Sequence, residues 1–423
     1  MTEEITIWPA LDLAPGDGAR PARLALEGGL VFKGWACGAD GEATGELCFN
    51  TAMTGYQEIL TDPSYCGQIV TLTAPQIGNY GVTATDNESR GCFCSGLVVR
   101  QMCAAPSNYA SLGSVPDWLR ERDVVAITGV DTRLLVTRLR QQGATMALIS
   151  TDADASDAEL VARARAAAPL TGRDLVRDVA YGRPWQVSAA GATPYRVVAI
   201  DSGIKFNIVR NLAALGCELR VLPPTTTAKE IYALDPDGLF LSNGPGDPQP
   251  LDYLYRTVSE LIGELPIFGI CLGHQILSLA VGAKTYKLKY GHHGGNHPVK
   301  NLLTGAVEIT AQNHGFCVDF NSIGPAVQTG ADEAPVVQSA KHGRVQLTHL
   351  NCNDQTVEGI RLLDRQAYSV QYHPEAGPGP SDAHYLFKDF IALMAARRLA
   401  SGAFTDAGVP AALKESEVAY AAA

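Results

Sequence analysis

The chain has 423 residues, of which 46% are hydrophobic and 18% are charged, enough apolar material for two or three domains with cores of their own. This composition excludes a disordered protein, and no apolar run reaches the eighteen residues or so that a membrane-spanning helix needs. With 33 basic and 44 acidic residues the net charge is −11, which disfavours binding to the phosphates of DNA or RNA. We therefore expect neither a nucleic-acid partner nor a membrane partner.

The amino-terminal residues and the cysteines bear on the cellular compartment. Residues 1–13 are acidic and lack the basic and apolar segments of a signal peptide, and they are too poor in Arg and Ser for a transit peptide. The ten cysteines are scattered and include no Cys-x-x-Cys pair, so a structural zinc site is not expected. The sequence thus predicts a cytoplasmic protein with reduced thiols.

The first half of the chain predicts a β-rich α/β domain over residues 21–188, preceded by a tail of residues 1–20. An apolar run over residues 23–34 is interrupted by Gly28 and Gly29, which is the pattern of a β-hairpin. Further strands are predicted at 46–50, 68–73, 96–100 and 124–127, and helices at 132–142 and 155–168. No cluster of catalytic side chains stands out in this half.

A segment of small residues that ends in proline, 189–194, predicts a linker. After it, short apolar strands alternate with amphipathic helices. The predicted strands are 195–200, 218–222, 238–241 and 267–270, and the predicted helices are 207–215, 227–234, 252–263 and 272–281. This alternation predicts an α/β domain over residues 195–398 whose parallel sheet has helices on both faces. Residues 399–423 are loosely patterned and are expected to form a frayed tail without a role.

The strongest functional signal follows the strand predicted at 267–270. Cys271 stands directly between this strand and the next helix, with Gly269 and Gly273 beside it, as in a nucleophile elbow. Small neighbours are needed because such a turn crowds the backbone. The helix N-terminus favours the thiolate, and the backbone N–H of Leu272 can face a developing oxyanion. The alternative is a buried structural cysteine at a tight turn.

A base for this thiol is predicted from residues 369–376. His373 and Glu375 are two positions apart, so in an extended segment their side chains point to the same side. Glu375 can then accept a hydrogen bond from one ring nitrogen and turn the other toward the thiol. Alone, the segment is equally compatible with a surface turn. Together with Cys271 it predicts a Cys–His–Glu triad at the carboxyl edge of the sheet.

Three other segments carry weaker signals. The loop 241–248 has two glycines around a proline and exposes N–H groups suited to an oxyanion or to a substrate backbone. The polar segment 311–316 is interpreted as a loop that could shape a pocket. His292 and His293 are adjacent without a carboxylate at metal-binding spacing, so no metal is expected. No G-x-x-x-x-G-K-[ST] segment occurs, so ATP binding by a phosphate-binding loop is not expected.

These motifs resemble those of a known family. Residues 269–275 and 372–375 are similar to the motifs of class I glutamine amidotransferases, which hydrolyse the side-chain amide of glutamine with a Cys–His–Glu triad and pass the ammonia to a synthase. The chain more specifically resembles the small chains of glutamine-hydrolysing carbamoyl-phosphate synthases. This closer resemblance is carried by residues 49–65, 131–133, 291–298 and 311–316. Altogether the resemblance extends over residues 20–398.

The resemblance implies roles for individual residues. Cys271 would be the nucleophile, His373 the general base and later the acid, and Glu375 the partner that orients His373. Gly244 and Leu272 would supply backbone N–H groups to the oxyanion. The L-glutamine site would comprise Ala52, Gly244, Gly246, Leu272, Gln275, Asn313, Gly315 and Phe316. Some relatives have serine at the position of Ala52, where a backbone contact would persist but a hydroxyl contact would be lost.

The resemblance also implies a partner, the large chain of carbamoyl-phosphate synthase, in a heterodimer. That chain would hold ATP and Mg and make carbamoyl phosphate from bicarbonate for arginine and pyrimidine synthesis, while no cofactor is expected in the small chain itself. A tight interface follows because ammonia released into neutral water becomes ammonium. Three alternatives stay open: the glutaminase part of another synthase, such as anthranilate or GMP synthase, a free-standing cysteine hydrolase of γ-glutamyl substrates, and a non-catalytic scaffold.

Overall fold

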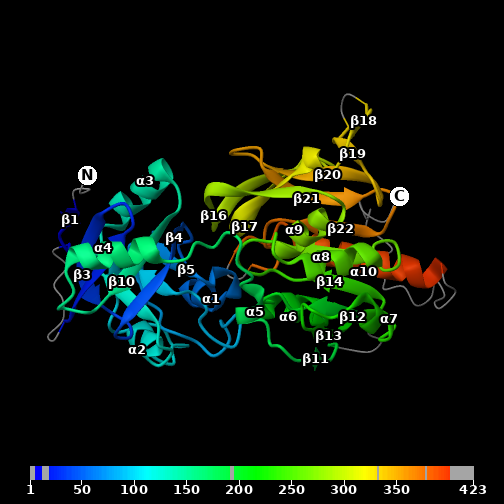
Figure 1. Ribbon diagram of the computed structural model, residues 1–423. Coiled ribbons are helices and arrows are strands. Elements are labelled where there is room, and N and C mark those ends of the chain that lie inside the picture. Colours follow the sequence, from blue (N-terminus) through cyan, green and yellow to red (C-terminus); the bar gives the residue numbers. More distant parts are fainter. Residues whose placement is uncertain (1–4, 12–18, 191–194, 331–332, 377–378, 401–423) are drawn as a thin grey trace. The chain divides into compact units, whose positions relative to one another are not determined.

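The computed structural model describes residues 5–11, 19–190, 195–330, 333–376 and 379–400 (Figure 1). The chain divides into two compact units. Unit 1 comprises residues up to 175 together with 288–294, and unit 2 comprises 176–287 and the residues from 295 onward. Most of the predicted linker and of the two predicted tails lies outside the described residues. None of the described helices is both long and apolar enough to cross a membrane.

Unit 1 is built mainly of strands, as predicted, and its main sheet has the order β1-β3-β2-β10-β4-β5-β7-β9. Strand β9 pairs with β3 as well, so the sheet closes on itself from β3 round to β9. The strands are β1 (Thr6–Trp8), β2 (Pro21–Leu26), β3 (Leu30–Ala36), β4 (Glu42–Asn50), β5 (Gln68–Leu72), β6 (Gln76–Ile77), β7 (Gly96–Val98), β8 (Gln101–Met102), β9 (Val125–Thr128) and β10 (Thr145–Ser150). The helices are α1 (Tyr56–Thr61), η1 (Pro63–Tyr65), α2 (Val115–Arg120), α3 (Thr132–Gln142) and α4 (Asp157–Ala166).

Local sequence signals explain several elements of unit 1. The predicted hairpin is present as β2 and β3, and Gly29 in its turn has a φ of 87°, a conformation that favours glycine. Helix α3 spans the predicted residues, and the Asp131 side chain accepts a hydrogen bond from the Leu134 N–H at its start. Helix α4 begins with a capping box between Ser156 and Glu159.

Unit 2 contains the predicted alternation of strands and helices. Its strands are β11 (Trp185–Val187), β12 (Tyr195–Ile200), β13 (Cys217–Leu222), β14 (Gly238–Leu241), β15 (Ile267–Ile270), β16 (Lys284–Asn301, of which 288–294 count with unit 1), β17 (Val307–Asp319), β18 (Ala326–Val327), β19 (Val336–Ser339), β20 (Gly343–Asn351), β21 (Val357–Leu362) and β22 (Ala367–Val370). Its helices are α5 (Val176–Val179), α6 (Phe206–Ala214), α7 (Ala228–Tyr232), α8 (Asp252–Leu261), α9 (Leu272–Ala280), η2 (Phe320–Ser322) and α10 (Tyr385–Ala400).

The sheet of unit 2 has the order β11-β13-β12-β14-β15-β22-β21-β20-β16-β17. The pairs from β13 through β22 are parallel, as predicted, and the pairs from β22 through β20 to β16 are antiparallel. The loop predicted at residues 311–316 was wrong, because these residues lie inside strand β17. Their polar side chains obscured the strand pattern, although most of them are buried.

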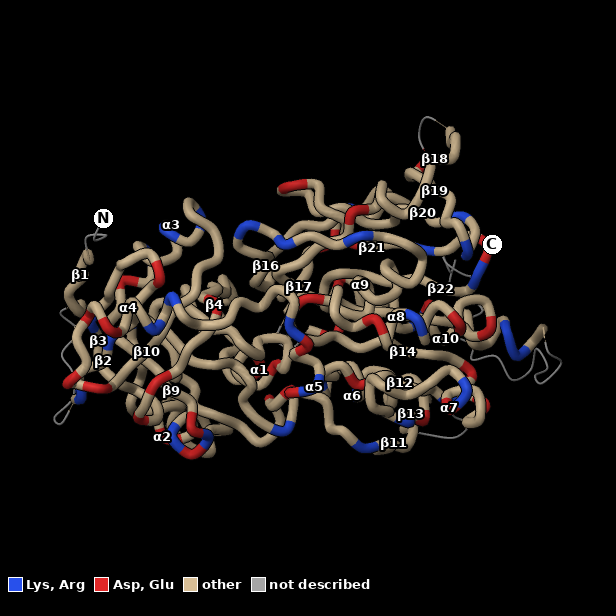
Figure 2. Tube along the Cα trace, viewed as in Figure 1, with Lys and Arg blue, Asp and Glu red and all other residues tan. Residues whose placement is uncertain are grey.

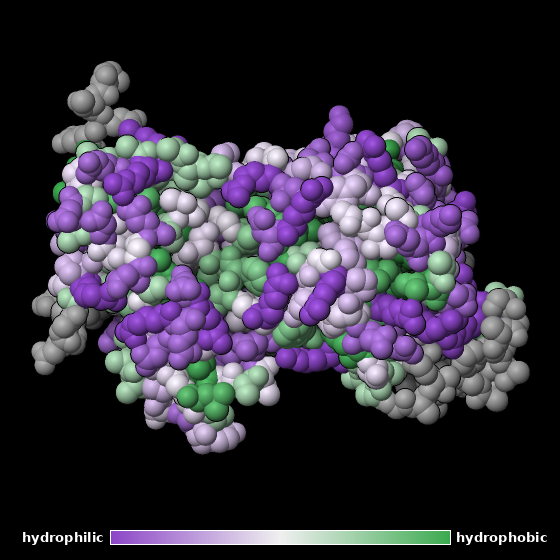
Figure 3. Space-filling view, turned by 60° about the horizontal axis from the view of Figure 1, so that its bottom comes forward, coloured by the Kyte–Doolittle hydropathy of each residue, from purple (hydrophilic) through white to green (hydrophobic). Residues whose placement is uncertain are grey.

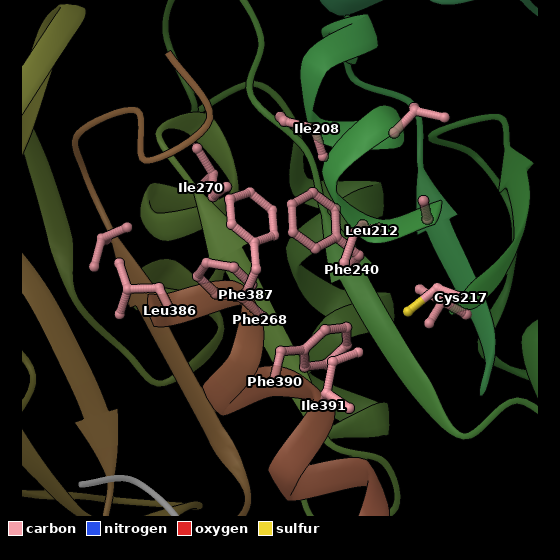
Figure 4. Packing of buried hydrophobic residues seen from close by; sticks show 14 of the residues in the cluster. Ile208, Leu212, Cys217, Phe240, Phe268, Ile270, Leu386, Phe387, Phe390 and Ile391 are labelled. Atoms are coloured by element: carbon pink, nitrogen blue, oxygen red, sulfur yellow. The ribbon is translucent and has the colours of Figure 1, made fainter. Parts of the chain in front are cut away.

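The core of unit 2 lies between the parallel strands and two helices, α6 and α10 (Figure 4). Phe240 of β14 and Phe268 of β15 meet edge to face, with ring centroids 5.4 Å apart. Phe387 and Phe390 of α10 extend this aromatic group. Helices α8 and α9 pack together, and α9 lies against β14, β15 and β22. The packed sheet thereby holds the end of β15, where Cys271 follows, in a fixed position.

The surface carries charges of both signs. Figure 2 shows lysine and arginine interspersed with aspartate and glutamate along the described chain. On the face drawn in Figure 3, hydrophobic residues lie in small groups among hydrophilic ones. Large apolar side chains are nonetheless exposed at Met53, Tyr109 and Leu112 in unit 1.

Candidate active site

Cys271 occupies a strained turn between strand β15 and helix α9. Its backbone has φ 56° and ψ −106°, which is rare for a residue with a side chain, and its N–H donates to the Val370 carbonyl oxygen at 2.9 Å. A Cβ at Gly273 would lie 2.2 Å from the carbonyl oxygen of Leu241, so only glycine fits. The predicted strand–elbow–helix arrangement is therefore confirmed, together with the reason for its glycines.

The surroundings of Cys271 suit a reactive thiol. The side chain is buried, and Sγ donates to the Asn313 carbonyl oxygen at 3.6 Å. The thiol sits at the N-terminus of α9, whose first N–H groups lack partners within the helix, which favours a negative charge there. The loop after β14 lies against this turn, since a Cβ at Gly244 would be 2.6 Å from the Leu272 side chain. Gly244 and Leu272 are thus brought together beside the nucleophile.

His373 and Glu375 form the expected hydrogen-bonded pair. Nδ1 of the His373 ring lies 2.7 Å from Oε1 of Glu375, and both side chains are buried. The backbone N–H of His373 donates to the Ala311 carbonyl oxygen at 2.9 Å, which ties this segment to strand β17. Within the described part of the chain, Nε2 of His373 is buried without a hydrogen-bond partner. That nitrogen is the one available to the thiol.

Electrostatics favour charged forms of this pair. Burial alone would lower the pKa of His373, but the Glu375 carboxylate and the neighbouring Cys271 outweigh it and raise the pKa well above its usual value. Burial likewise opposes ionisation of Glu375, yet the ammonium of Lys205 and the ring of His373 lower the pKa of Glu375. The resting site thus tends toward an imidazolium held by a carboxylate.

Lys205 also takes part in this pair and was not predicted from the sequence. Its Nζ lies 2.9 Å from Oε1 of Glu375, the same oxygen that bonds His373. The residue is buried and precedes helix α6, in the loop that follows strand β12. That loop lies at the carboxyl end of a parallel strand, and this position was the available signal.

Most residues predicted to line the glutamine site lie together around Cys271. Nε2 of Gln275 donates to the Phe316 carbonyl oxygen at 2.9 Å and to Oε1 of Gln371 at 3.1 Å. Asn313 contacts the thiol through its carbonyl, and a Cβ at Gly315 would meet open space. Gly246 adopts a φ of 79° in the loop after β14. Ala52 belongs to unit 1, where its N–H donates to Oδ1 of Asn50 at 2.7 Å.

Comparison with known proteins identifies both halves of the chain. Residues 24–149 match the family described as carbamoyl-phosphate synthase small chain, CPSase domain, and residues 198–393 match glutamine amidotransferase class-I. The chain is 50% identical to the carbamoyl phosphate synthase small chain of Syntrophotalea carbinolica, over 90% of this chain and 100% of that one. It is 53% identical to the small chain of Chlorobaculum tepidum, over 88% and 98% of the two chains. It is 48% identical to the small chain of Pseudomonas aeruginosa, over 90% of this chain and 100% of that one.

Two solved structures show a distant likeness to part of this chain. A glutamine amidotransferase from Thermotoga maritima is 16% identical and covers 50% of this chain and 87% of its own, with a TM-score of 0.32. A putative GMP synthase protein from Thermoplasma acidophilum is 23% identical, covers 50% of this chain and 100% of its own, and has a TM-score of 0.39.

Proposed function

The chain belongs to the family of carbamoyl-phosphate synthase small chains, and from this premise we propose which of its residues catalyse the reaction. Members of this family are the glutamine-hydrolysing subunits of the synthase, and so is this chain. We assign Cys271 as nucleophile, His373 as general base and acid, and Glu375 as the group that orients His373. The observation that carries this assignment is the 2.7 Å distance between Nδ1 of His373 and Oε1 of Glu375. It leaves Nε2 of His373, which has no hydrogen-bond partner among the residues that the structure describes, to interact with the neighbouring Cys271.

The proposed reaction has two halves. In the first, the Cys271 thiolate attacks the side-chain amide carbon of glutamine, and the oxyanion accepts hydrogen bonds from the backbone N–H groups of Gly244 and Leu272. His373 then protonates the leaving nitrogen, which departs as ammonia and leaves a γ-glutamyl thioester on Cys271. In the second half, His373 takes a proton from water, the resulting hydroxide attacks the thioester, and glutamate and the free thiolate are released.

Binding of glutamine is assigned to the groups that surround the thiol. We propose that Gln275, Asn313, Gly315 and Phe316 line the side of the site formed by α9 and β17. Gly246, with Gly244 and Leu272, would line the opposite side. Gly315 supports this assignment because open space lies where a side chain would project. For Ala52 we propose a backbone contact, since alanine offers no hydroxyl.

The ammonia formed here has to reach a second active site. Small chains of this family imply a large-chain partner, and we propose that this partner binds ATP and Mg and receives ammonia directly. Direct transfer is supported by simple chemistry, because ammonia in neutral water is protonated and ceases to be a nucleophile. We also propose a cytoplasmic heterodimer, since ATP and glutamine are both abundant in that compartment, and a product that serves arginine and pyrimidine synthesis.

The test combines the chain with a synthase large chain and measures carbamoyl phosphate. Glutamine should support synthesis, Cys271→Ser should abolish it, and added ammonia should restore it, because ammonia bypasses the glutaminase step. Loss of the nucleophile should lower the rate by several orders of magnitude. If the wild-type chain hydrolyses glutamine equally well with and without the large chain, and no carbamoyl phosphate forms, the partner assignment is wrong and a free-standing hydrolase is the better description.

A further inference from the structure

Strand β17 forms hydrogen bonds with two adjacent residues of another segment, Tyr372 and His373. The Ala311 carbonyl oxygen accepts a hydrogen bond from the His373 backbone N–H at 2.9 Å. Three residues earlier on the same strand, Oε2 of Glu308 accepts a hydrogen bond from the Tyr372 hydroxyl at 3.1 Å. The first contact is made by the backbone and would survive most substitutions. The second depends entirely on two side chains.

Glu308 is a buried carboxylate with a full set of donors. It is 7% exposed, and its other oxygen, Oε1, accepts from Nδ2 of Asn301 at 3.2 Å and from the Tyr385 hydroxyl at 3.0 Å. Asn301 also donates to the Tyr385 hydroxyl at 3.0 Å, so these groups form one connected network. Asp382 is the neighbouring acidic residue whose charge interacts with that of Glu308. A polar cluster this well bonded in a core holds its members in one arrangement.

Tyr372 has little freedom to move inside the core. Its side chain is fully buried, and its ring meets the ring of His349 edge to face, with centroids 5.6 Å apart. The hydroxyl bond to Glu308 fixes the far end of the same ring. Because Tyr372 and His373 are consecutive, any shift of the tyrosine backbone also moves the imidazole.

We propose that Tyr372 and Glu308 act as positioning residues, which hold the His373 imidazole in line with the Cys271 thiol. The inference rests on the proposed catalytic role of His373. Proton transfer requires Nε2 to approach the sulfur and then the leaving nitrogen, and both steps are sensitive to small displacements of the ring. Tyr385 bonds the same carboxylate but stands at the start of α10, in a different segment from His373, which makes it a matched control.

The experiment compares Tyr372→Phe with Tyr385→Phe in the full chain bound to the large chain. Each variant removes one tyrosine hydroxyl that donates a hydrogen bond to the buried carboxylate of Glu308. We expect Tyr372→Phe to lower kcat for glutamine hydrolysis about tenfold with KM within about twofold, and Tyr385→Phe to keep kcat within about twofold. Ammonia-dependent synthesis should be unchanged in both. Thermal unfolding is measured in parallel, because a purely structural role would lower the stability of both variants and leave the kcat of each unaffected.

Two outcomes would overturn the inference: wild-type kcat in Tyr372→Phe, or equal losses of kcat in both variants. Cys271→Ser is run alongside as a control for the triad assignment. If the triad assignment were wrong, the Ser variant would still hydrolyse glutamine; if only the positioning role were wrong, it would not.

If Tyr372→Phe does not fold, Glu308→Gln and Glu308→Met replace it. The side chain in Glu308→Gln keeps an oxygen and adds an amide group, both of which can bond the tyrosine hydroxyls, so kcat should stay within about threefold of the wild type. The side chain in Glu308→Met cannot replace these bonds, so kcat should fall about tenfold. Equal kcat in these two variants would likewise exclude a positioning role.

Discussion

Lys205 and Glu375 form a buried ion pair in which Nζ lies 2.9 Å from Oε1. The same carboxylate oxygen bonds Nδ1 of His373 at 2.7 Å, so one oxygen is shared by an ammonium and an imidazole. Lys205 lowers the pKa of Glu375 and also lowers that of His373, and so moderates the stabilisation of the imidazolium by the carboxylate. The lysine therefore adjusts the pKa of His373, the residue proposed as the base for Cys271.

Replacing Lys205 should change the pH dependence of glutamine hydrolysis. In Lys205→Met the pKa of both Glu375 and His373 rises, so as pH falls each group is protonated earlier than in the wild type. The acidic limb of kcat/KM, on which protonation of Glu375 removes the carboxylate that holds the imidazolium, should therefore move to higher pH by about one unit. Lys229→Met, at an exposed lysine of α7, is the control and should reproduce the wild-type profile. A Lys205→Met profile that overlays the wild type would contradict this account.

The cysteines should differ sharply in reactivity. Burial raises the pKa of Cys37, Cys92, Cys217 and Cys317 to about 12, so these thiols stay protonated at neutral pH. Cys271 instead lies at a helix N-terminus beside the His373 ring. A chloroketone analogue of glutamine should label Cys271 alone, at one equivalent per chain, as measured by peptide mass spectrometry. Excess glutamine should protect it, and labelling of Cys217 at a comparable rate would speak against the assignment.

Gly273→Ala tests the steric requirement of the elbow. The added Cβ would lie 2.2 Å from a backbone oxygen of Leu241, which cannot move aside as a flexible side chain could. We expect a loss of about 2 kcal/mol or more in the free energy of unfolding, together with loss of glutamine hydrolysis. Gly28→Ala is the control, because no atom lies within 4 Å of its added Cβ, and its stability should change by less than about 0.5 kcal/mol. Urea unfolding measures both, and equal stabilities would refute the steric argument.

Asp389 should make the stability of the chain depend on pH. It lies on α10, buried, with no hydrogen bond to Oδ2 from the described residues, and burial raises its pKa to about 7. The folded state thus retains a proton that the unfolded state releases near pH 4. Consequently this carboxyl costs stability as pH rises from 4 to 7, and the cost is constant above that range.

Asp389→Asn removes this titration without changing the size of the side chain. Relative to the wild type, the variant should gain about 2–4 kcal/mol in the free energy of unfolding between pH 4 and pH 8. The measurement is urea unfolding of both chains at several pH values, and only their difference is interpreted, because other groups titrate in both. Glutamine hydrolysis should persist, since Asp389 lies outside the proposed site. A pH-independent difference would show that the Asp389 carboxyl is not perturbed.

The sequence by itself determined the features that depend on near neighbours in the chain. Gly269, Cys271 and Gly273 predicted the elbow because a sharp strand-to-helix turn needs small residues at those positions. The spacing of His373 and Glu375 predicted their bond. The extended segment assumed for them was wrong, because strand β22 ends at Val370 and residues 374–375 form a turn, which brings the two side chains together instead. The alternation of strands and helices likewise predicted the parallel part of the sheet in unit 2.

Only the tertiary structure decided which distant residues complete the site. Lys205 meets Glu375, and Glu308 meets Tyr372, because sheet order and register bring separate segments to one edge, and no local pattern encodes that order. Residues 311–316 were mistaken for a loop for the same reason, since their polar side chains are buried by neighbours that are remote in the chain. Local spacing specifies backbone conformation, whereas the partners of a buried charge depend on how the whole sheet packs.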